Sequence, residues 1–337
     1  MYHLNQIGDF LFSLPLLASL RQAFPQAKIV SILRPALVDL WKMSGLGHEY
    51  IVRPPGQSLQ DRARLVCALR KRRPDLAVVI AQSYEPPILA WLSGARTRIG
   101  FQPNPFALFL THRVKKDTPP SISNNLLLLQ QLGITPNKTD YTGLIHPLRG
   151  EVHRMHGRLE EAGVRDNDDL VLLAPGASAK RAVKEWDYTR FARVADYFNE
   201  KPGVKVAVVG TLPADELIQQ ASSHILDFTC STSLTELTAL IERATLFIGI
   251  DSGTLHLAGA LAVPLVGIYG PTDHTITGPP GPWCRIVRTG IECSPCRENY
   301  CRIQTRECMQ NLPESLVIEA AEDLWQMIKR VRITSQP

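Results

Sequence analysis

The sequence predicts an α/β protein built on parallel sheets. Short apolar runs rich in Val, Ile and Leu recur along the chain, and longer amphipathic segments separate them. Continuous apolar strands that alternate with helices are typical of parallel sheets covered on both faces. The runs are AKIVSIL (27–33), LAVVIA (76–81), LVLLAPG (170–176), VKVAVVG (204–210), TLFIGID (245–251) and PLVGIYG (264–270).

Helical periodicity fills most of the segments between these runs. Stretches rich in proline, glycine or polar residues at 102–121, 134–150 and 271–282 predict loops instead. The sequence has no repeat of the solenoid type. The predicted helices are 11–24, 59–73, 122–133, 151–163, 188–200, 213–222, 233–243 and 254–261, with a last one at about 313–331.

The length of the chain predicts two domains. Its 337 residues exceed what one hydrophobic core usually supports. The polar stretch GVRDNDD (163–169) precedes a new strand, so we place the domains at 1–165 and 166–337. Ligands of open α/β sheets bind at the carboxyl ends of the strands, so two such units are expected to face a cleft there.

Composition indicates an ordinary globular protein, with 45% apolar residues, 20% charged residues and a net charge of +5. The basic clusters RKRR (70–73) and HRVKK (112–116) suit an anionic partner, although a solvated basic face explains them as well. No apolar run reaches the roughly 18 residues of a membrane span. No Lys or Arg precedes the apolar segment 10–20, unlike in a signal peptide. We expect a cytoplasmic protein that binds no nucleic acid.

Asp9 stands directly after Gly8 and before the apolar run LFSLPLLASL. One interpretation is that it caps the amino end of a helix that starts near Phe10. The other is that it lies at the mouth of the cleft, where a carboxylate can accept a proton from a hydroxyl group. The two roles are compatible.

The segment LFIGIDSGTLHLAGAL (246–261) reads as strand, turn and helix. Free N–H groups at the start of that helix, together with its dipole, would bind a diphosphate. Gly253 would let the main chain approach such a ligand closely. The alternatives are a helix-capping role for Asp251 and a buried core position for His256.

The segment PGASAKRAVKEWDYTRFARVAD (175–196) places Ser178 and several basic residues after another predicted strand. A lysine that reaches a phosphate there would offset the charge of a departing nucleotide, although such a lysine is more often only solvated. The sequence lacks G-x-G-x-x-G after a strand, the P-loop and the G-x-S-x-G elbow. Dinucleotide, P-loop and α/β-hydrolase interpretations therefore lose support.

Four ordered segments resemble the ADP-heptose:lipopolysaccharide heptosyltransferase family, glycosyltransferase family 9, over nearly the whole chain. They are QIGDFLFSLPLLASLRQAFPQAKI, PGAS...KEWDYTRFA, VVGTLPADE and DSGTLHLAGALAVPLVGIYGPTD. The resemblance implies a GT-B architecture with two Rossmann-like domains that face a central cleft. It implies that the first domain binds the acceptor, that the second binds the nucleotide sugar, and that the last helix packs back on the first domain.

In activity, the resemblance implies inverting transfer of heptose from ADP-heptose to the inner core of lipopolysaccharide, without a catalytic metal or other required cofactor. It implies peripheral contact with the cytoplasmic face of the inner membrane. Two other interpretations stay open: a nucleotide-sugar epimerase of the same fold, and a non-catalytic paralogue that binds nucleotide sugar.

The resemblance also implies roles for individual residues. Asp9 matches the general base, Lys184 the lysine on the donor phosphates, and Asp251 the acid that faces the donor sugar. Lys180 competes with Lys184, because KEWD departs from the family's usual K-R-W-P, and Arg98 is a candidate on the acceptor side. The further donor contacts are Ser178, Glu216 or its neighbour Asp215, Ser231, Thr232, Ser252, Gly253, Thr254, Leu255 and His256.

Five of the seven cysteines lie between residues 284 and 308. Four of these thiols could form a tetrahedral structural site for zinc or iron. Reduced thiols are the alternative, since disulfides are disfavoured in the cytosol. Cys67 and Cys230 are expected to be core residues. The candidate ligands are Cys293, Cys296, Cys301 and Cys308.

Overall fold

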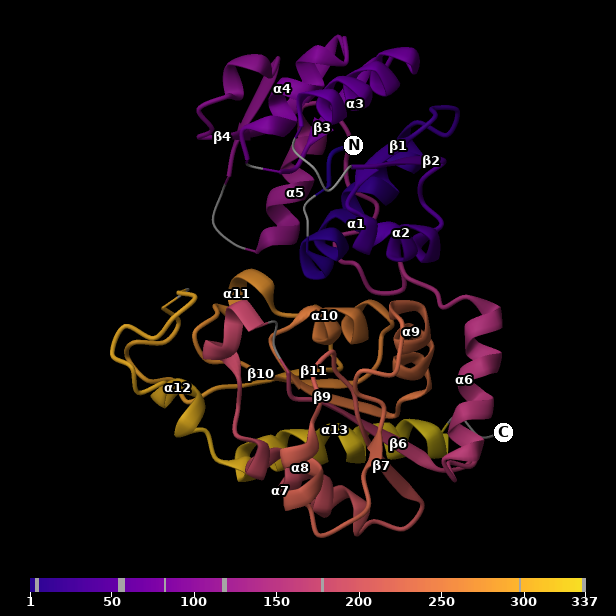
Figure 1. Cartoon of the computed structure of the whole chain (residues 1–337), viewed down its shortest axis with the longest axis vertical. Helices are drawn as coiled ribbons and strands as arrows, with labels where there is room; N and C mark the ends of the chain where they lie inside the picture. The colour runs from indigo at the N-terminus through magenta and orange to yellow at the C-terminus, as the bar shows by residue number, and fades with distance from the viewer. Residues whose placement is uncertain are drawn as a thin grey trace. The chain divides into compact units, whose positions relative to one another are not determined.

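The computed structural model describes residues 1–3, 6–53, 58–81, 83–116, 120–176, 179–296 and 298–334. The chain forms two compact units, Met1–Leu144 and Ile145–Pro337 (Figure 1). Both units contain parallel strands flanked by helices, so the predicted α/β class is confirmed. Among the described residues, none of the helices combines the length and the apolar character that crossing a membrane requires.

The first unit holds a parallel sheet in two parts, β1–β2 and β3–β4–β5. Tyr2 makes parallel bridges to Ile32 of the first part and to Val79 of the second, so the amino-terminal segment lies between them. The strands are β1 (Val30–Leu33), β2 (Glu49–Val52), β3 (Leu76–Val79), β4 (Thr97–Gln102) and β5 (His112–Lys115). The helices are α1 (Ile7–Ala23), α2 (Val38–Ser44), α3 (Leu59–Lys71), α4 (Glu85–Leu92) and α5 (Ser121–Gln130), with 3-10 turns η1 (Pro35–Leu37) and η2 (Ala107–Phe109).

The second unit is a single parallel sheet covered on both faces. Helices α9 and α10 lie on one side of the sheet, and α7, α8 and α13 lie on the other (Figure 1). Its strands are β6 (Asp169–Ala174), β7 (Val204–Val208), β8 (Leu226–Asp227), β9 (Leu246–Ile250), β10 (Leu265–Ile268) and β11 (Cys284–Val287). Its helices are α6 (Arg149–Glu161), α7 (Tyr188–Asn199), α8 (Asp215–Gln220), α9 (Leu234–Arg243), α10 (Gly253–Ala260), α11 (His274–Thr277), α12 (Glu307–Gln310) and α13 (Glu314–Thr334), with the 3-10 segment η3 (Ala179–Lys184).

The strand order of the second unit is β11-β10-β9-β6-β7-β8, and every neighbouring pair is parallel. The chain starts at the centre with β6, moves outward through β7 and β8, and then returns to build β9 to β11 on the other side. This is the strand order of the Rossmann fold, and the order reverses between β6 and β9. The central strands β6 and β9 are buried at every residue. Ligands of such sheets bind at the reversal point, which directs attention to the carboxyl ends of β6 and β9.

The expected packing of the last helix on the first domain stays a prediction. Helix α13 belongs to the second unit and packs on α7 and on β9, β10 and β11 of that unit. Its apolar side chains recur at helical spacing and join the core of the second unit. These side chains are Val317, Ala321, Leu324 and Trp325.

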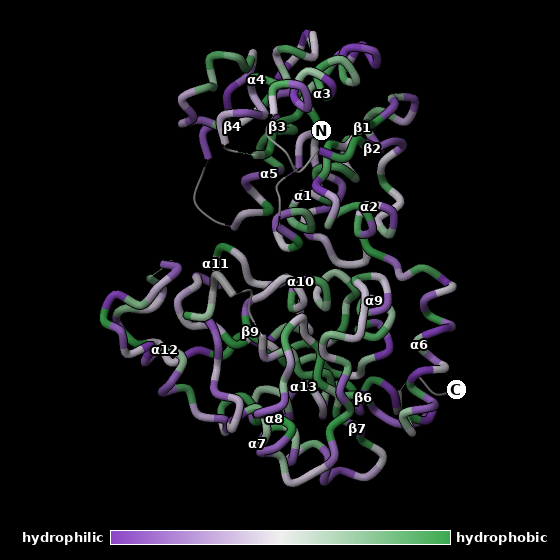
Figure 2. Tube along the Cα trace, in the orientation of Figure 1, coloured by the Kyte–Doolittle hydropathy of each residue, from purple (hydrophilic) through white to green (hydrophobic). Residues whose placement is uncertain are grey.

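The units divide between Leu144 and Ile145, earlier than the boundary that the polar stretch 163–169 predicts. The reason is α6, which lies before that stretch yet packs on α9 of the second unit. Figure 2 shows α6 alternating between hydrophobic and hydrophilic colours, as expected of a helix with one buried face. Met155 and Leu159 form that face.

Several short elements of the first unit carry little sequence pattern. Helix α4 begins with Glu85 and two prolines, which look like a loop in sequence although proline is well tolerated in a first helical turn. Strand β5 lies inside the basic cluster 112–116, and charged residues are common on edge strands. In the first unit, the structure therefore adds strands β2, β4 and β5 and helices α2 and α4 to the predicted elements.

Helix α13 is also held by charge. Lys329 and Arg332 pair with Asp169 at the start of β6, and the hydroxyl of Thr245 donates to the same carboxylate at 3.0 Å. Burial alone raises the pKa of Asp169, but these hydrogen bonds outweigh burial and lower the pKa below its ordinary value. Such a group stabilises the folded state above its ordinary pKa and loses this contribution as the pH falls through the folded-state pKa.

Asp169→Asn is therefore expected to lower the free energy of unfolding at pH 7 by about 1–3 kcal/mol. The difference from the wild type should shrink as the pH falls below about 4, and urea unfolding followed by tryptophan fluorescence at both pH values measures it. Asp323→Asn is the control. Asp323 also lies on α13 and forms an ion pair, with Arg285 of β11, but its side chain is 58% exposed. Equal losses in the two variants would contradict the role of Asp169.

Candidate active site

The two most informative predicted residues lie at the reversal point of the second sheet. Lys184 ends η3, which follows β6, and Asp251 directly follows β9. Strands β6 and β9 are neighbours, and because both run in the same direction, their carboxyl ends share one edge of the sheet. The fold thus brings together two residues that are 67 positions apart in sequence.

Lys184, Asp251 and His256 form a buried polar cluster. The ammonium group of Lys184 pairs with Asp251 Oδ2 and also lies 3.3 Å from the carbonyl oxygen of Asp251. His256 Nε2 lies 3.3 Å from Asp251 Oδ1, so both carboxylate oxygens have a partner. All three residues are less than a tenth exposed. The carboxylate of Asp251 therefore fixes the positions of both the Lys184 ammonium group and the His256 ring.

The electrostatics keep this carboxylate ionised. Burial alone raises the pKa of Asp251, but the hydrogen bond with His256 and the positive charge of Lys184 hold it well below its usual range. An ionised Asp251 in turn favours a charged Lys184 in a site where burial alone would disfavour the charge. The cluster thus holds the ammonium group of Lys184 in a fixed position at the carboxyl edge of the sheet.

Helix α10 begins next to this cluster. Ser252 is its N-cap in extended conformation. Its side chain accepts no capping hydrogen bond from the main chain of the helix, and its hydroxyl lies 2.8 Å from that of Thr254. Gly253 opens the helix, and no acidic residue stands in the first turn. The side chain of Leu255 is fully buried, so only its main chain can serve a ligand. The positive end of the helix dipole and the charge of Lys184 thus act at neighbouring strand ends.

The remaining predicted donor residues follow the next strands along the same edge. Asp215 and Glu216 are exposed in the first turn of α8, after β7. Ser231 and Thr232 lie in the loop after β8. The predicted diphosphate, ribose and adenine contacts therefore occur in the order β9–β6, β7 and β8, across about three interstrand spacings, or roughly 14 Å. The predicted donor-binding residues therefore follow one another along this edge of the sheet.

Two further predicted residues belong to the segment after β6. Ser178 lies outside the described residues, and for Lys180 only the main chain is described, as part of η3. The competition between Lys180 and Lys184 thus stays a matter for experiment, while Lys184 has a defined buried position.

The structure adds two braces for the segment that carries Lys184. Trp186 Nε1 donates to the carbonyl of Leu312 at 2.9 Å, and the guanidinium of Arg306 donates to the carbonyl of Ala182 at 3.0 Å. Both partners come from the region after β11, which lies more than a hundred residues further along the chain. No sequence signal short of the fold indicates these contacts.

Asp9 lies in the first unit, in the first turn of α1, and is partly exposed. The N-cap of α1 is Gln6, so the interpretation of Asp9 as N-cap is wrong, although an acid in the first turn still suits the helix dipole. Lys116 is close by: partial burial lowers the pKa of Lys116, and the charge of Asp9 acts in the opposite direction. The ammonium of Lys116 lies 4.8 Å from the ring centre of Phe101. The sequence indicates Lys116 only as one member of a basic cluster.

Arg98, the candidate on the acceptor side, braces the main chain of the first unit. Its guanidinium donates to the carbonyl of Phe109 at 2.6 Å and to that of Ala95 at 2.5 Å. These contacts hold η2 against β4, so these guanidinium donors of Arg98 stabilise the fold of the first unit.

The seven cysteines are free thiols. Cys67 and Cys230 are exposed, so their expected place in the core is wrong; Cys67 lies on the outer face of α3, and Cys230 in the loop after β8. The segment with the other cysteines packs on the end of β10. There Ser294 donates to the carbonyl of Gly270 at 2.6 Å, and a Cβ atom on Gly270 would lie 2.3 Å from the sulfur of Met309.

The four candidate metal ligands are Cys293, Cys296, Cys301 and Cys308. Thiols are suitable ligands for zinc or iron, but the described positions of these four do not form a metal site. Burial is the main cause that raises the pKa of Cys308 to about 11, and interactions with Cys293, Cys296 and Cys301 act in the same direction. The main-chain N–H of Arg306 donates to the sulfur of Cys301 at 3.4 Å, and this contact lowers the pKa of that thiol. Yet in the described parts of the chain, no group of three or more His, Cys, Asp or Glu is placed to hold an ion.

Two Rossmann-type units in one chain, with a buried lysine–aspartate pair where the strand order of the second sheet reverses, define an α/β enzyme of the GT-B glycosyltransferase class. Residues 62–306 match the model of glycosyltransferase family 9 (heptosyltransferase). The chain therefore belongs to glycosyltransferase family 9 and is a glycosyltransferase.

Individual relatives agree with this assignment. The chain is 27% identical to lipopolysaccharide heptosyltransferase 3 of Escherichia coli K12, over 94% of this chain and 93% of that protein. Its fold resembles a family 9 glycosyltransferase from Veillonella parvula, with a TM-score of 0.83 at 24% identity over 97% and 96% of the two chains. It also resembles E. coli ADP-heptose lps heptosyltransferase II, with a TM-score of 0.78 at 20% identity over 97% and 98% of the two chains.

Proposed function

We propose that this protein transfers heptose from ADP-heptose to the inner core of lipopolysaccharide, with inversion at the anomeric carbon. The observation that carries the proposal is the buried cluster of Lys184, Asp251 and His256 beside the start of α10, in a chain that belongs to the heptosyltransferase family. Two of the named relatives are lipopolysaccharide heptosyltransferases. Their substrates are the proposed substrates of this chain.

In the proposed mechanism, the second unit binds the donor. The diphosphate lies at the start of α10, where main-chain N–H groups from Ser252 to Leu255 and the ammonium of Lys184 meet its charge. Glu216 or Asp215 accepts hydrogen bonds from the ribose hydroxyls, and the adenine lies at Ser231 and Thr232. Asp251 holds Lys184 and faces the donor sugar. Lys184 and the helix dipole supply the positive charge that a catalytic metal supplies in other transferases, so the reaction is proposed to need none.

The first unit provides the acceptor side and the general base. The acceptor oxygen forms a bond to the anomeric carbon while the bond from that carbon to the ADP oxygen breaks, and ADP leaves with the electron pair. The proton of the acceptor hydroxyl passes to the Asp9 carboxylate. Asp9 is partly exposed and so is accessible to such a hydroxyl. Attack opposite the leaving group inverts the configuration.

The test is product analysis with a panel of nucleotide sugars and truncated lipopolysaccharides, with and without a chelator. We expect ADP release that depends on both ADP-heptose and an inner-core acceptor and that survives the chelator. A heptosylated acceptor identified by mass spectrometry would be the product. Isomerisation of the free sugar nucleotide without acceptor would instead indicate an epimerase, and no turnover of any donor would indicate a binding paralogue.

Contact with the cytoplasmic face of the inner membrane is part of the proposal. The first unit carries 17 Lys and Arg against 8 Asp and Glu, whereas the second carries 20 against 24. Exposed Tyr84, Trp91 and Leu108 lie on the adjoining elements α4 and η2 of the basic unit. Basic and aromatic surface together suits anionic headgroups. Sedimentation with phosphatidylglycerol vesicles but not with phosphatidylcholine vesicles is expected; no sedimentation with either would exclude this contact.

A structural zinc or iron ion at the four-cysteine segment is likewise proposed. Its support is the spacing of the four cysteines in CSPCRENYCRIQTREC and the main-chain donor to Cys301, since N–H contacts stabilise the thiolate that metals bind. The ligands would be Cys293, Cys296, Cys301 and Cys308. Elemental analysis of the purified protein is expected to give about one zinc or iron per chain and none in the Cys293→Ser/Cys296→Ser variant. A metal-free wild type would indicate reduced thiols.

A further inference from the structure

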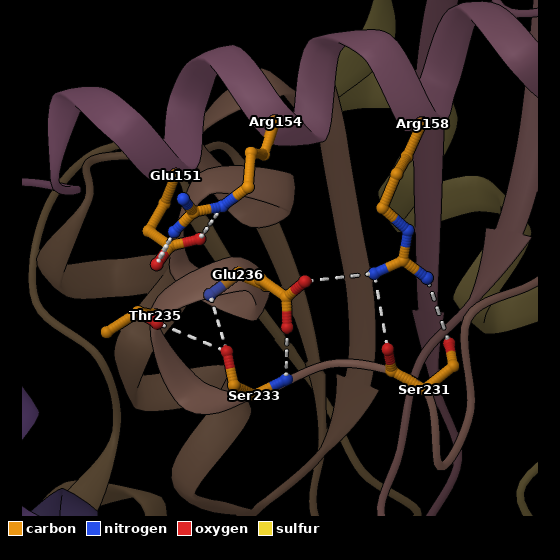
Figure 3. Close-up of polar contacts among 7 residues, drawn as sticks. All are labelled: Glu151, Arg154, Arg158, Ser231, Ser233, Thr235 and Glu236. Atoms are coloured by element: carbon orange, nitrogen blue, oxygen red, sulfur yellow. Dashed lines mark hydrogen bonds and ion pairs between the residues drawn. The ribbon is translucent and has the colours of Figure 1, made fainter.

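Arg158 connects α6 to the loop that follows β8. Figure 3 shows its guanidinium extended from α6 toward Ser231 and Glu236. Nη1 donates to the carbonyl oxygen of Ser231 at 3.2 Å and to Glu236 Oε1 at 3.3 Å, and Nη2 lies 3.3 Å from the hydroxyl of Ser231. The same guanidinium lies 5.4 Å from the ring centre of Phe228. One side chain thus contacts Phe228 and Ser231 of the loop and Glu236 in the first turn of α9.

The loop is also fixed on both sides of Ser231. Cys230 has the left-handed conformation, with φ of 54°, and its N–H donates to the carbonyl of Gly210 at 2.8 Å. On the other side, Ser233 and Glu236 form a capping box at the start of α9, in which the N–H of Ser233 donates to Glu236 Oε2 at 2.8 Å. Glu236 therefore accepts from Arg158 with one oxygen and from the loop with the other. The fork of Arg158 sets the orientation of the peptide between these two anchors.

Thr232 lies in the middle of this held loop. In the described part of the chain, its main chain makes no hydrogen bond to another main-chain group. A peptide presents one N–H donor and one carbonyl acceptor, and the edge of adenine presents a ring-nitrogen acceptor beside an amino donor. A main chain fixed in this way can pair its N–H and carbonyl groups with the adenine edge. Uracil presents a ring N–H donor beside a carbonyl acceptor, which is the reverse order of donor and acceptor.

We propose that Arg158 is a positioning residue that gives the donor site its preference for adenine, by holding the main chain of Ser231 and Thr232. This inference rests on the proposed function, in which the donor is an adenine nucleotide. Arg158 itself does not touch the reacting atoms, because it acts at the end of the sheet edge opposite the diphosphate. Its loss should therefore weaken nucleotide binding and leave the chemical step unchanged.

A neighbouring arginine offers a matched control. Arg154 is on the same helix and pairs with Glu151, one turn away, with its Nε at 3.2 Å from Glu151 Oε2 (Figure 3). Its side chain is 63% exposed, against 32% for Arg158. Both variants remove one positive charge from α6, but only the change at Arg158 releases the loop. The apolar contacts of Met155 and Leu159 that hold α6 in place stay intact in both.

The experiment compares the wild type with Arg158→Ala, Arg158→Lys and Arg154→Ala. Calorimetry measures the Kd for ADP and for UDP, and transferase assays measure KM for ADP-heptose and kcat. Arg158→Ala is expected to raise the Kd for ADP and the KM about tenfold, to leave kcat within about twofold, and to reduce the preference for ADP over UDP. Arg158→Lys should restore little, since an ammonium cannot form the two-pronged contact. Arg154→Ala should match the wild type.

Unchanged ADP affinity in Arg158→Ala would overturn the inference, as would equal losses from Arg154→Ala or a fall in kcat at constant KM. If Arg158→Ala does not fold, Arg158→Lys decides in the same way, because it keeps the charge and the stem. Wild-type protein that binds no ADP would overturn the proposed donor as well as the inference. ADP binding in the wild type with no effect of Arg158 would overturn the inference alone.

Discussion

Lys184→Met is expected to lower kcat/KM for ADP-heptose by roughly 10²–10³-fold, because one preorganised charge on a developing anion is worth a few kcal/mol in the transition state. Lys184 is buried, and its ammonium is held by both the carboxylate and the carbonyl of Asp251. It therefore needs little reorganisation to meet a diphosphate, and methionine keeps most of its volume while it removes the charge. Steady-state kinetics with ADP-heptose and a truncated lipopolysaccharide measure the effect.

Loss of stability has to be separated from loss of function in this variant. Removal of one partner of a buried ion pair leaves the other charge buried without a partner. This lowers the free energy of unfolding by about 3–5 kcal/mol when no further partner remains. Here His256 stays 3.3 Å from Asp251, so we expect a smaller loss. The double variant Lys184→Met/Asp251→Asn removes both charges and should regain much of the thermal stability without regaining activity. Activity that returned with stability would show that Lys184 is structural.

Asp9→Asn is expected to abolish most of the transferase activity, by roughly 10²–10⁴-fold in kcat, since an amide cannot accept the proton of the attacking hydroxyl. The fold should persist, because Asp9 is partly exposed and α1 is held by its buried apolar residues, among them Phe10, Leu14 and Leu17. The affinity for ADP should stay unchanged, because the proposed donor site lies in the second unit. Kinetics and calorimetry on the same preparation distinguish these effects.

Asp39→Asn is the matched control for Asp9. Asp39 also stands in the first turn of a helix of the first unit, α2, where it pairs with Lys42 at 3.4 Å on the surface. If acids in first turns matter only through the helix dipole, the two variants should behave alike. Full transferase activity in Asp9→Asn would remove the proposed base from the mechanism.

The strongly periodic elements were predictable from sequence. The central strands of the second unit are continuous apolar runs, and β6 and β9 are buried at every residue. Weakly patterned elements were not: β5 has one buried residue among four, and α4 opens with prolines. A pattern reports burial, so an edge strand or a helix with an unusual first turn leaves little trace in it.

Much of the candidate site could be located from sequence as well. Asp251 and His256 could be located from sequence because they stand within six residues of each other. Asp251 follows a clear strand, and His256 lies in the first turn of a clear helix. Their partner Lys184 was indicated only through family resemblance. The contacts of Arg158 with Ser231 and of Arg306 with Ala182 join positions 73 and 124 residues apart. Such pairs depend on which elements become neighbours, and no local pattern encodes that.

The sequence by itself determined the α/β class, the position of most helices and central strands, and the residues at the ends of those strands. These are local properties, set by the spacing of apolar side chains and by the residues that start and stop helices. The tertiary structure alone decided that α6 belongs to the second unit, that Lys184 and Asp251 form a buried pair, and that Arg158 holds the loop after β8. Each of these depends on the strand order, which reverses at the centre of the sheet and brings distant segments to one edge.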